Sequence, residues 1–295
     1  MRRVLAVIAL LTVSVWHASA ADAATLDTAK IEALTGAKGK LDEKEGAFKV
    51  SVPRTDLTVS VGGVHLTPAM GLTSWAAFEP TGAHAMVMGD LVLLEDQVNP
   101  VMSTALENGL QVTALHNHFF WDTPKVMFMH IGGMADQEAL ATAVGKVFAK
   151  IRDTSGVKGG APSGNIDPAK TTLAPEKIEA VLGVKGELKD GVYKVVIGRV
   201  AKMDGAEIGS TMGVNTWAAF AGSDDEAVVD GDFAMLESEL QAVLKALRAA
   251  GINVVAIHQH MTGETPRIMF LHYWGVGPTA ALAGGLKAAL DTQKH

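Results

Sequence analysis

The chain has 295 residues, of which 48% are hydrophobic and 19% charged, and its formal net charge at pH 7 is −7. It has no cluster of basic residues with interleaved aromatics, which excludes nucleic acid as a partner. Cysteine is absent, so disulfides, thiolate metal ligands and a lipid-modified cysteine are excluded, and a hydrophobic core must stabilise the fold.

Residues 1–20 have the pattern of a secretory signal peptide. Arg2 and Arg3 precede an apolar run over 4–15, and Ala18, Ser19 and Ala20 fit a cleavage site of the A-x-A type. The run is too short for a membrane span, so we expect no stable span after the signal is removed. The mature chain would carry 23 basic and 32 acidic residues, a net charge of −9. We expect a periplasmic or secreted protein, with a retained N-terminal anchor as the alternative.

The sequence contains two copies of one unit. Residues 71–133 align with residues 213–275 without a gap at a shift of 142, and 23 of these 63 positions are identical. Between the copies, residues 152–176 are rich in Gly, Pro, Ser and Thr, which is typical of a linker. The chain is therefore predicted to be a tandem duplication, with repeat domain 1 over 25–151 and repeat domain 2 over 177–293.

Each copy has the same order of predicted elements. Repeat 1 opens with a short helix near 27–36, followed by extended segments and strands near 46–52, 57–66, 75–79 and 85–94. A helix then begins at Asp96 and ends at Gly109, and a hairpin and a closing helix over 135–151 complete the unit. The order β-β-α-β-β-α predicts an α+β fold, with antiparallel or mixed sheets covered by helices.

The second copy adds two local predictions. Ser238 and Gln241 have the spacing of a capping box at a helix start. The closing helix is expected over 279–291. Because each copy carries a full set of elements, we expect repeat 2 to fold alone unless the two sheets share a buried interface.

Both hairpins carry the pattern HxH, eleven residues and a third His. Side chains at i and i+2 of a strand point to the same face, about 7 Å apart. If the strands fold back about Thr123, His116 lies across from His130 and His118 across from Phe128. Three imidazoles on one face suit a three-histidine metal site for a divalent ion, and we expect Zn²⁺; the alternative is a structural polar cluster. The candidate ligands are His116, His118 and His130 in repeat 1 and His258, His260 and His272 in repeat 2.

Two acids recur beside these patterns and are candidate catalytic or ligating groups. Asp90 and its counterpart Asp232 lie in otherwise apolar strands, where an unpaired charge is costly. Glu95 and Glu237 lie at a helix N-terminus, where the dipole favours a negative charge, so capping is their alternative role. Either acid can complete the metal site, orient an imidazole or act as general base.

Other candidates are weaker. Met127 and Met129 fall on the strand face opposite His130, where we expect them to pack beneath a helix rather than bind copper. Trp75 and its counterpart Trp217 are expected in the core rather than in a substrate platform. His65 and His84 have no histidine counterpart and are expected at the surface.

The run from Met88 to Met102, with Ala114–His118 and Pro124–His130, resembles the bacterial LppY/LpqO family, whose domain has no known function. The resemblance covers nearly the whole mature chain. Named members are lipoproteins, but this chain lacks the lipobox cysteine, so lipid anchoring does not follow.

The HxH pattern with a third His about a dozen residues later is similar to the zinc site of alpha-acetolactate decarboxylase and related PPC-type domains. That similarity implies the same six histidines as ligands, although no Gly-Gly precedes the third His here. Two functions follow. One is a zinc-dependent hydrolase or decarboxylase-like lyase acting on a small substrate. The other is a non-catalytic module that binds a metal or an envelope ligand.

Overall fold

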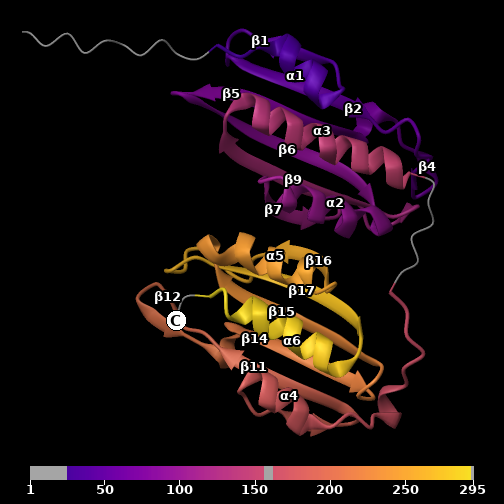
Figure 1. Cartoon of the computed structure of the whole chain (residues 1–295), viewed down its shortest axis with the longest axis vertical. Helices are drawn as coiled ribbons and strands as arrows, with labels where there is room; N and C mark the ends of the chain where they lie inside the picture. Colours follow the sequence, from indigo (N-terminus) through magenta and orange to yellow (C-terminus); the bar gives the residue numbers. More distant parts are fainter. Residues whose placement is uncertain (1–24, 156–161, 294–295) are drawn as a thin grey trace, which may run out of the picture.

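The computed structural model describes residues 25–155 and 162–293 (Figure 1). The predicted signal peptide lies outside these residues. Within them, no helix combines the length and the apolar character that crossing a bilayer requires. Helices and antiparallel strands recur in the same order in both repeats, so the predicted α+β fold and the tandem repeat are confirmed.

One antiparallel sheet of twelve strands runs through both repeats. Across the sheet, repeat 1 contributes β1 (Gly39–Asp42), β2 (Ala47–Pro53), β5 (Thr73–Thr81), β6 (His84–Leu94), β9 (Val126–Ala135) and β7 (Gln111–His116). Repeat 2 follows with β16 (Asn253–His258), β17 (Ile268–Gly277), β15 (Ala227–Leu236), β14 (Asn215–Gly222), β11 (Val192–Gly198) and β10 (Glu187–Lys189). The second order is the reverse of the first, so an approximate twofold axis relates the repeats.

The repeats meet at a seam between β7 and β16. One ladder pair joins the strands, between the buried residues Leu115 and Ile257, which are equivalent positions of the two copies. Asn99 exchanges two hydrogen bonds with the backbone of Val254, at 2.8 and 3.1 Å. Its counterpart Gln241 does the same with Val112, at 2.8 and 2.9 Å. The two predicted sheets are therefore one sheet with a shared interface.

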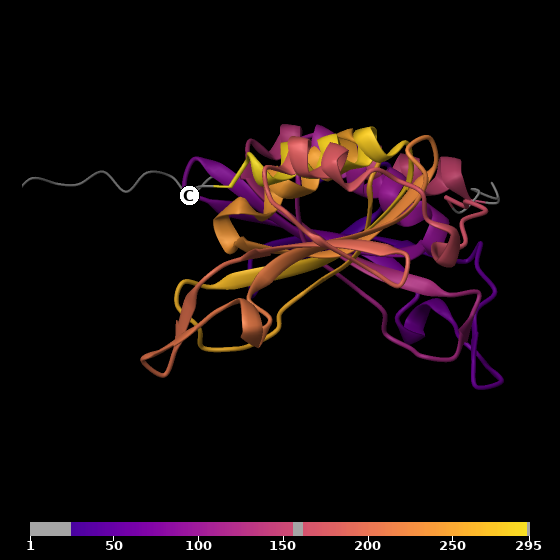
Figure 2. The same ribbon diagram turned by 90° about the horizontal axis from the view of Figure 1, so that it is seen from below.

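The main helices cover one face of the sheet (Figure 2). They are α2 (Glu95–Glu107), α3 (Gln137–Thr154), α5 (Leu240–Ala249) and α6 (Thr279–Leu290), with α1 (Thr28–Thr35) packed on α3 and α4 (Pro175–Leu182) packed on α6. Met129 is fully buried in the core beneath them and Met127 packs against it, which confirms the predicted direction of these side chains. We call the opposite side of the sheet the open face.

Two small lobes flank the open face (Figure 2). In repeat 1 the lobe contains β3 (Ser60–Val61), β4 (Val64–His65), β8 (Asp122–Thr123) and the 3₁₀ helix η1 (Pro68–Met70). In repeat 2 it contains β12 (Ala201–Met203), β13 (Ala206–Ile208) and η3 (Ser210–Met212). Each lobe has its own core, which includes Phe128 in repeat 1 and Phe270 in repeat 2. The extended segment predicted near 57–66 is reduced to the two short strands β3 and β4.

Helix boundaries differ from the sequence prediction in two places. The capping box predicted for Ser238 and Gln241 is wrong, because Glu239 Oε2 accepts the backbone N–H of Leu236 at 2.9 Å and Gln241 bonds across the seam. A 3₁₀ turn, η4 (Glu237–Glu239), therefore precedes α5. The linker expected from residue 152 begins later, since α3 extends to Thr154, and it contains η2 (Pro168–Lys170).

An arginine stands at the start of α2 and again at the start of η4; Arg54 is buried and Arg199 is partly buried. Arg54 is 2% exposed and bonds the Asp56 carboxylate at 2.9 Å and Gln97 Oε1 at 3.2 Å. Arg199 instead pairs with Glu239, which is 3% exposed, at 2.6 Å. Both pairs connect the open face to the helix layer.

Candidate metal centre

The sheet ladder places an acid beside a histidine in each repeat. On β6 and β9, Asp90 lies directly opposite His130; on β15 and β17, Asp232 lies directly opposite His272. Side chains of opposed residues share one face, and their Cβ atoms are about 5 Å apart. Since Met129 points into the helix-covered core, the acid and the histidine point to the open face.

The hairpin register differs from the expected one. His116 lies opposite Phe128 rather than His130, which faces Ala114 instead. The predicted tight turn about Thr123 does not form, because residues 117–125 make a longer loop whose strand β8 pairs with β3. The difference is an even number of residues, so every side chain keeps its face and the histidines still meet.

The middle histidine of each pattern lies beyond the strand end, in the loop. The ring of His118 stacks on Phe128 with centroids 3.3 Å apart, and His260 stacks on Phe270 at 3.5 Å. Stacking on the phenylalanine ring thus positions this imidazole beside the two others. Sequence reasoning missed this role, although Phe128 and Phe270 were visible as identical residues of the aligned copies.

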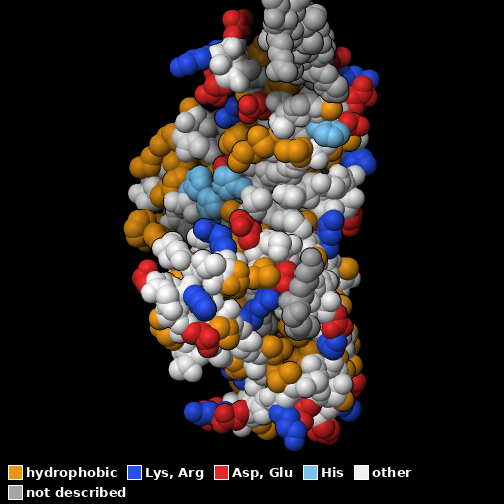
Figure 3. All heavy atoms as spheres, turned by 90° about the vertical axis from the view of Figure 1, so that its left-hand side faces the viewer, with side chains coloured by type: hydrophobic (Ala, Val, Ile, Leu, Met, Phe, Trp, Pro, Cys, Tyr) orange, Lys and Arg blue, Asp and Glu red, His pale blue; other side chains and the backbone are white. Residues whose placement is uncertain are grey.

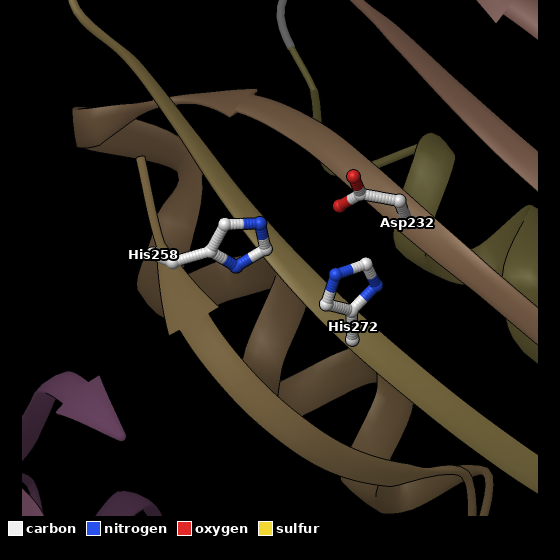
Figure 4. Close-up of side chains that lie close together, drawn as sticks. All are labelled: Asp232, His258 and His272. Carbon is white, nitrogen blue, oxygen red and sulfur yellow. The ribbon is translucent and has the colours of Figure 1, made fainter. Parts of the chain in front are cut away.

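In repeat 2 the candidate ligands converge on one space (Figure 4). Asp232, His258 and His272 each offer a ligand atom, and these atoms all lie within 4.8 Å of one another. The fourth candidate, His260, places Nε2 at 3.1 Å from both His258 Nε2 and Asp232 Oδ2. One acid and three imidazoles are therefore brought together.

Backbone carbonyls face the other ring nitrogen of several histidines. His272 Nδ1 lies 3.3 Å from the carbonyl oxygen of Gly231, and His260 Nδ1 lies 3.3 Å from that of Gly213. In repeat 1, His116 Nδ1 lies 3.4 Å from the carbonyl oxygen of Asn117. A neutral imidazole that donates from Nδ1 presents a lone pair at Nε2, which is the arrangement found in metal-ligating histidines.

The titration behaviour of repeat 2 follows from burial. Burial, reinforced by the neighbouring His272 and His260, lowers the pKa of His258 to about 4. Burial also raises the pKa of the Asp232 carboxyl, against the opposing influence of the two histidines. His258 is therefore neutral at pH 7, which is the form that binds a metal.

Two buried carboxylate oxygens lack a partner at these sites. Among the described residues, neither Asp90 Oδ1 nor Asp232 Oδ1 accepts a hydrogen bond, and His258 Nδ1 also has no partner. A buried acceptor without a partner costs free energy. A cation bound among the imidazoles would satisfy the carboxylates, so the donor set and its orphaned atoms fit a divalent metal.

The centre in repeat 1 has the same composition but looser spacing. His116 Nε2 lies 3.0 Å from His130 Nε2, whereas Asp90 Oδ1 is 4.0 Å from His130 Nε2. Burial, followed by the charge of His116, lowers the pKa of His118. In the space-filling view, histidine side chains cluster at the surface of the repeat 1 half, next to hydrophobic side chains (Figure 3).

The other acidic candidates lie elsewhere. Glu95 is the first residue of α2 and Glu237 the first of η4, and both are exposed. Each is five residues beyond the aspartate of its repeat, which corresponds to about 16 Å along the strand. The structure therefore brings Asp90 and Asp232 to the histidines and places the two glutamates at helix starts.

Trp75 and Trp217 are not core residues, which corrects the prediction. Both are half-buried on the open face, where they lie directly opposite Asp90 and Asp232. The Lys49 ammonium lies 3.9 Å from the centroid of the Trp75 ring, and the same contact recurs in repeat 2. An indole, a carboxylate and an imidazole thus form one row across each half of the sheet.

The glycine before each aspartate is required by packing. A Cβ at Gly231 would lie 2.2 Å from the Tyr273 hydroxyl and 2.4 Å from the Trp217 carbonyl oxygen. At Gly89 it would lie 2.7 Å from the Trp75 carbonyl oxygen. The recurrent Gly-Asp pair in the sequence therefore marks a close approach of strands beside the centre.

The turn acids Asp122 and Glu264 have a structural task. Each is more than nine-tenths buried and accepts the backbone N–H four residues later, that of Val126 at 2.8 Å and of Ile268 at 3.0 Å. These bonds fix the loop that carries the middle histidine to the first residue of the next strand.

A family profile described as Domain of Unknown Function (DUF1259) matches residues 29–150 and again residues 176–292. A comparison with curated proteins gave no match. The crystal structure of a trimeric bacterial microcompartment shell protein, PduB, is 12% identical over 86% of this chain and 89% of that chain, with a TM-score of 0.20, too low to support any argument. The two profile matches cover most of the chain, one in each repeat, and the protein belongs to this family of unknown function.

Proposed function

We propose that each repeat binds one divalent metal ion, most favourably Zn²⁺, through its three histidines and its aspartate. The convergence of Asp232, His258 and His272 within 4.8 Å carries this proposal. Two imidazole nitrogens at tetrahedral zinc are about 3.3 Å apart, given Zn–N bonds of 2.0–2.1 Å. The 3.1 Å separation of His258 and His260 Nε2 is close to that value.

The donor types support zinc over the other metals. Imidazole nitrogen with one carboxylate is a common zinc set, whereas Ca²⁺ and Mg²⁺ prefer oxygen ligands alone. The chain has no cysteine to supply thiolate, and Met127 and Met129 point away from the histidines, so a Cu(I) site is not supported.

We further propose that the centre catalyses hydrolysis or decarboxylation of a small substrate. Bound zinc would polarise a carbonyl group or lower the pKa of a water molecule to about 7. Asp232 would hold or accept a proton at its Oδ1 when it is not a ligand, and Trp217 beside it offers an apolar wall on the open face. The resemblance of the sequence to the LppY/LpqO family and to PPC-type zinc domains is part of the support for this proposal.

A second function is favoured by the position of His260, whose Nε2 lies 3.1 Å from both Asp232 Oδ2 and His258 Nε2. If His260 and Asp232 are both ligands together with His258 and His272, four protein groups fill a tetrahedral shell and no position stays open. The protein would then be a metal-binding module without catalysis.

We propose export of the protein on the basis of the predicted signal peptide alone. Mass spectrometry of the exported protein should show Ala21 as the first residue.

Calorimetric titration of metal-free protein with Zn²⁺ tests metal binding. We expect two ions per chain, one ion after His118→Ala, and none after His260→Ala is added. His65→Ala and His84→Ala are matched controls that should bind two ions. Equal zinc stoichiometry in wild type and double variant would overturn the proposal.

Co²⁺ substitution then separates the two functions. An open position predicts that azide changes the visible spectrum of the cobalt protein, because the anion enters the coordination shell. A spectrum that is unchanged by azide would show a closed shell and favour the metal-binding module.

A further inference from the structure

A pocket of about 830 Å³ lies beside the seam and is lined by both repeats. Repeat 1 contributes the first turns of α2, including Glu95 and Asn99, and also Lys125. Repeat 2 contributes Arg248, Asn253 and Trp274. No histidine lines it, so it is separate from both metal centres.

Arg248 is held by neutral groups. Its Nε donates to Ser103 Oγ at 3.1 Å, and its Nη1 donates to the Ile252 carbonyl oxygen at 2.8 Å and to Asn253 Oδ1 at 3.0 Å. Among the described residues, no carboxylate lies within ion-pair distance and Nη2 has no acceptor. Burial lowers the pKa of this guanidinium, but it stays charged at neutral pH. A partly desolvated cation without an anion is unfavourable, and an anionic ligand would relieve that cost.

Glu95 and Asp96 both line the pocket, and among the described residues neither forms an ion pair with Arg248. Glu95 and Lys125 directly adjoin the ladder pair Leu94–Val126, so two opposite charges lie in neighbouring strand-end positions. Glu95 also lies in the first turn of α2, where the helix dipole favours a negative charge. Asp230 is exposed and adjoins Trp274 from β15, on the side away from Asn253. The charge that a ligand meets at Arg248 is therefore positive.

An aromatic ring lines the same pocket as the guanidinium. Trp274 is 38% exposed and pairs across the strands with Asn253, the residue whose amide oxygen accepts from Arg248. Arg248, Asn253 and Trp274 thus form a continuous row along the pocket wall. A carboxylate bound at Nη2 would place its attached ring in the pocket that the exposed indole also lines.

The approximate twofold axis shows that the fold does not require this row. The equivalent positions of repeat 1 are Leu106, Gln111 and Gly132, and Gln111 pairs with Gly132 as Asn253 pairs with Trp274. The same backbone is therefore built without the cation and without the ring. If the fold required these side chains, both repeats would have them.

We propose that the seam pocket binds a small aromatic carboxylate, with the carboxylate on Arg248 and the ring against Trp274. The site is independent of metal, because no candidate metal ligand lines the pocket.

Binding is tested on metal-free full-length protein by calorimetry with benzoate, its neutral analogue benzamide and the ring-free anion acetate. We expect benzoate to bind at least tenfold more tightly than either analogue. Arg248→Gln should reduce benzoate affinity about tenfold or more and leave benzamide unchanged. Trp274→Leu should weaken benzoate and benzamide but not acetate. The matched control Lys245→Gln, an exposed cation on the same helix, should bind benzoate as wild type does.

Several outcomes would overturn the proposal. They are no benzoate binding to the wild type, equal affinity for benzoate and acetate, or equal benzoate affinity in wild type and Arg248→Gln. If Arg248→Gln does not fold, Arg248→Lys and Trp274→Leu take its place. Unchanged benzoate affinity in both would then contradict the assignment.

Discussion

The two candidate metal centres share one backbone frame but differ in how closely the acid approaches the histidines. The Asp232 side chain is 4% exposed and lies 3.1 Å from a histidine nitrogen, whereas the Asp90 side chain is 14% exposed and lies 4.0 Å from one. The ladder rows are the same in both repeats, so the difference comes from side chains and loops rather than from the sheet. Both repeats thus keep three histidines and one aspartate, and we expect their affinities for metal to differ.

The loops before the turn acids also differ. In repeat 1 the exposed Phe120 and Trp121 contact each other edge to face beside the centre, and repeat 2 has Thr262 and Gly263 at these positions. The aligned residues thus give one centre an exposed aromatic neighbour and the other a small polar one. We therefore expect repeat 2 to hold metal more tightly and repeat 1 to be the more selective for what approaches it.

The largest expected effect separates the two aspartates. Asp232→Asn should weaken zinc binding at the proposed site of repeat 2 about 100-fold or more, because the buried acid of a compact group loses its charge. Asp90→Asn should weaken the other site only about tenfold, since this carboxylate is farther away and more exposed. Competition with a chromophoric zinc chelator measures both constants. Equal losses in the two variants would show that the centres are equivalent and end the comparison.

The second effect concerns the ion pairs of Arg54 and Arg199. Glu239→Gln should lower the free energy of unfolding by about 2 kcal/mol, because Glu239 is buried and the partly buried Arg199 would lose its carboxylate partner. Asp56→Asn should cost only about 1 kcal/mol, because Asp56 is 41% exposed and water already screens its pair with Arg54. Urea denaturation of the metal-free proteins measures both values.

The control for that experiment is an exposed ion pair of the same repeat. Asp291→Asn, which removes the partner of Lys287 on α6, should change stability by less than about 0.5 kcal/mol. A loss from Asp56→Asn as large as that from Glu239→Gln would contradict the role assigned to burial.

Periodicity and repetition predicted much of the fold and of the site. The HxH pattern predicted that three histidines meet on one strand face. The first and third histidines do share that face, because the register moved by two residues and the parity of the strand was kept, whereas the middle histidine reaches them from the loop. Identity between the copies singled out Asp90 and Asp232. Each repeat has two recurrent acids, an aspartate and a glutamate. Which of the two lies beside the histidines depends on its distance from them along the strand, and only the structure gives that distance.

The seam between β7 and β16 could not be predicted from the sequence. It depends on one ladder pair, between Leu115 and Ile257, and on the amides of Asn99 and Gln241, none of which has a distinctive pattern. The tight turn about Thr123 failed because pairing of β8 with β3 is a long-range contact. Trp75 was placed in the core because a large apolar residue in a strand usually is, yet the face it occupies is open.

The smallest expected effect is the pH dependence that His258 alone confers on repeat 2. Its pKa is about 4 in the folded protein and about 6.5 in the unfolded chain, so the unfolded state binds the extra proton first as the pH falls. Stability is therefore full above pH 6.5 and decreases between pH 6.5 and 4. The raised pKa of Asp232 acts in the opposite direction and is present in wild type and variant alike.

Between pH 7 and pH 5, His258 should account for a loss of about 1 kcal/mol in the metal-free protein, after allowance for its partial exposure. His258→Gln, which cannot be protonated, should lose that much less on acidification, whereas His65→Gln, an exposed residue, should behave as wild type does. Urea unfolding at the two pH values gives the difference directly. A pH dependence that is the same in wild type and His258→Gln would mean that this imidazole is not held neutral by burial, and the electrostatic contrast between the two repeats would fail with it.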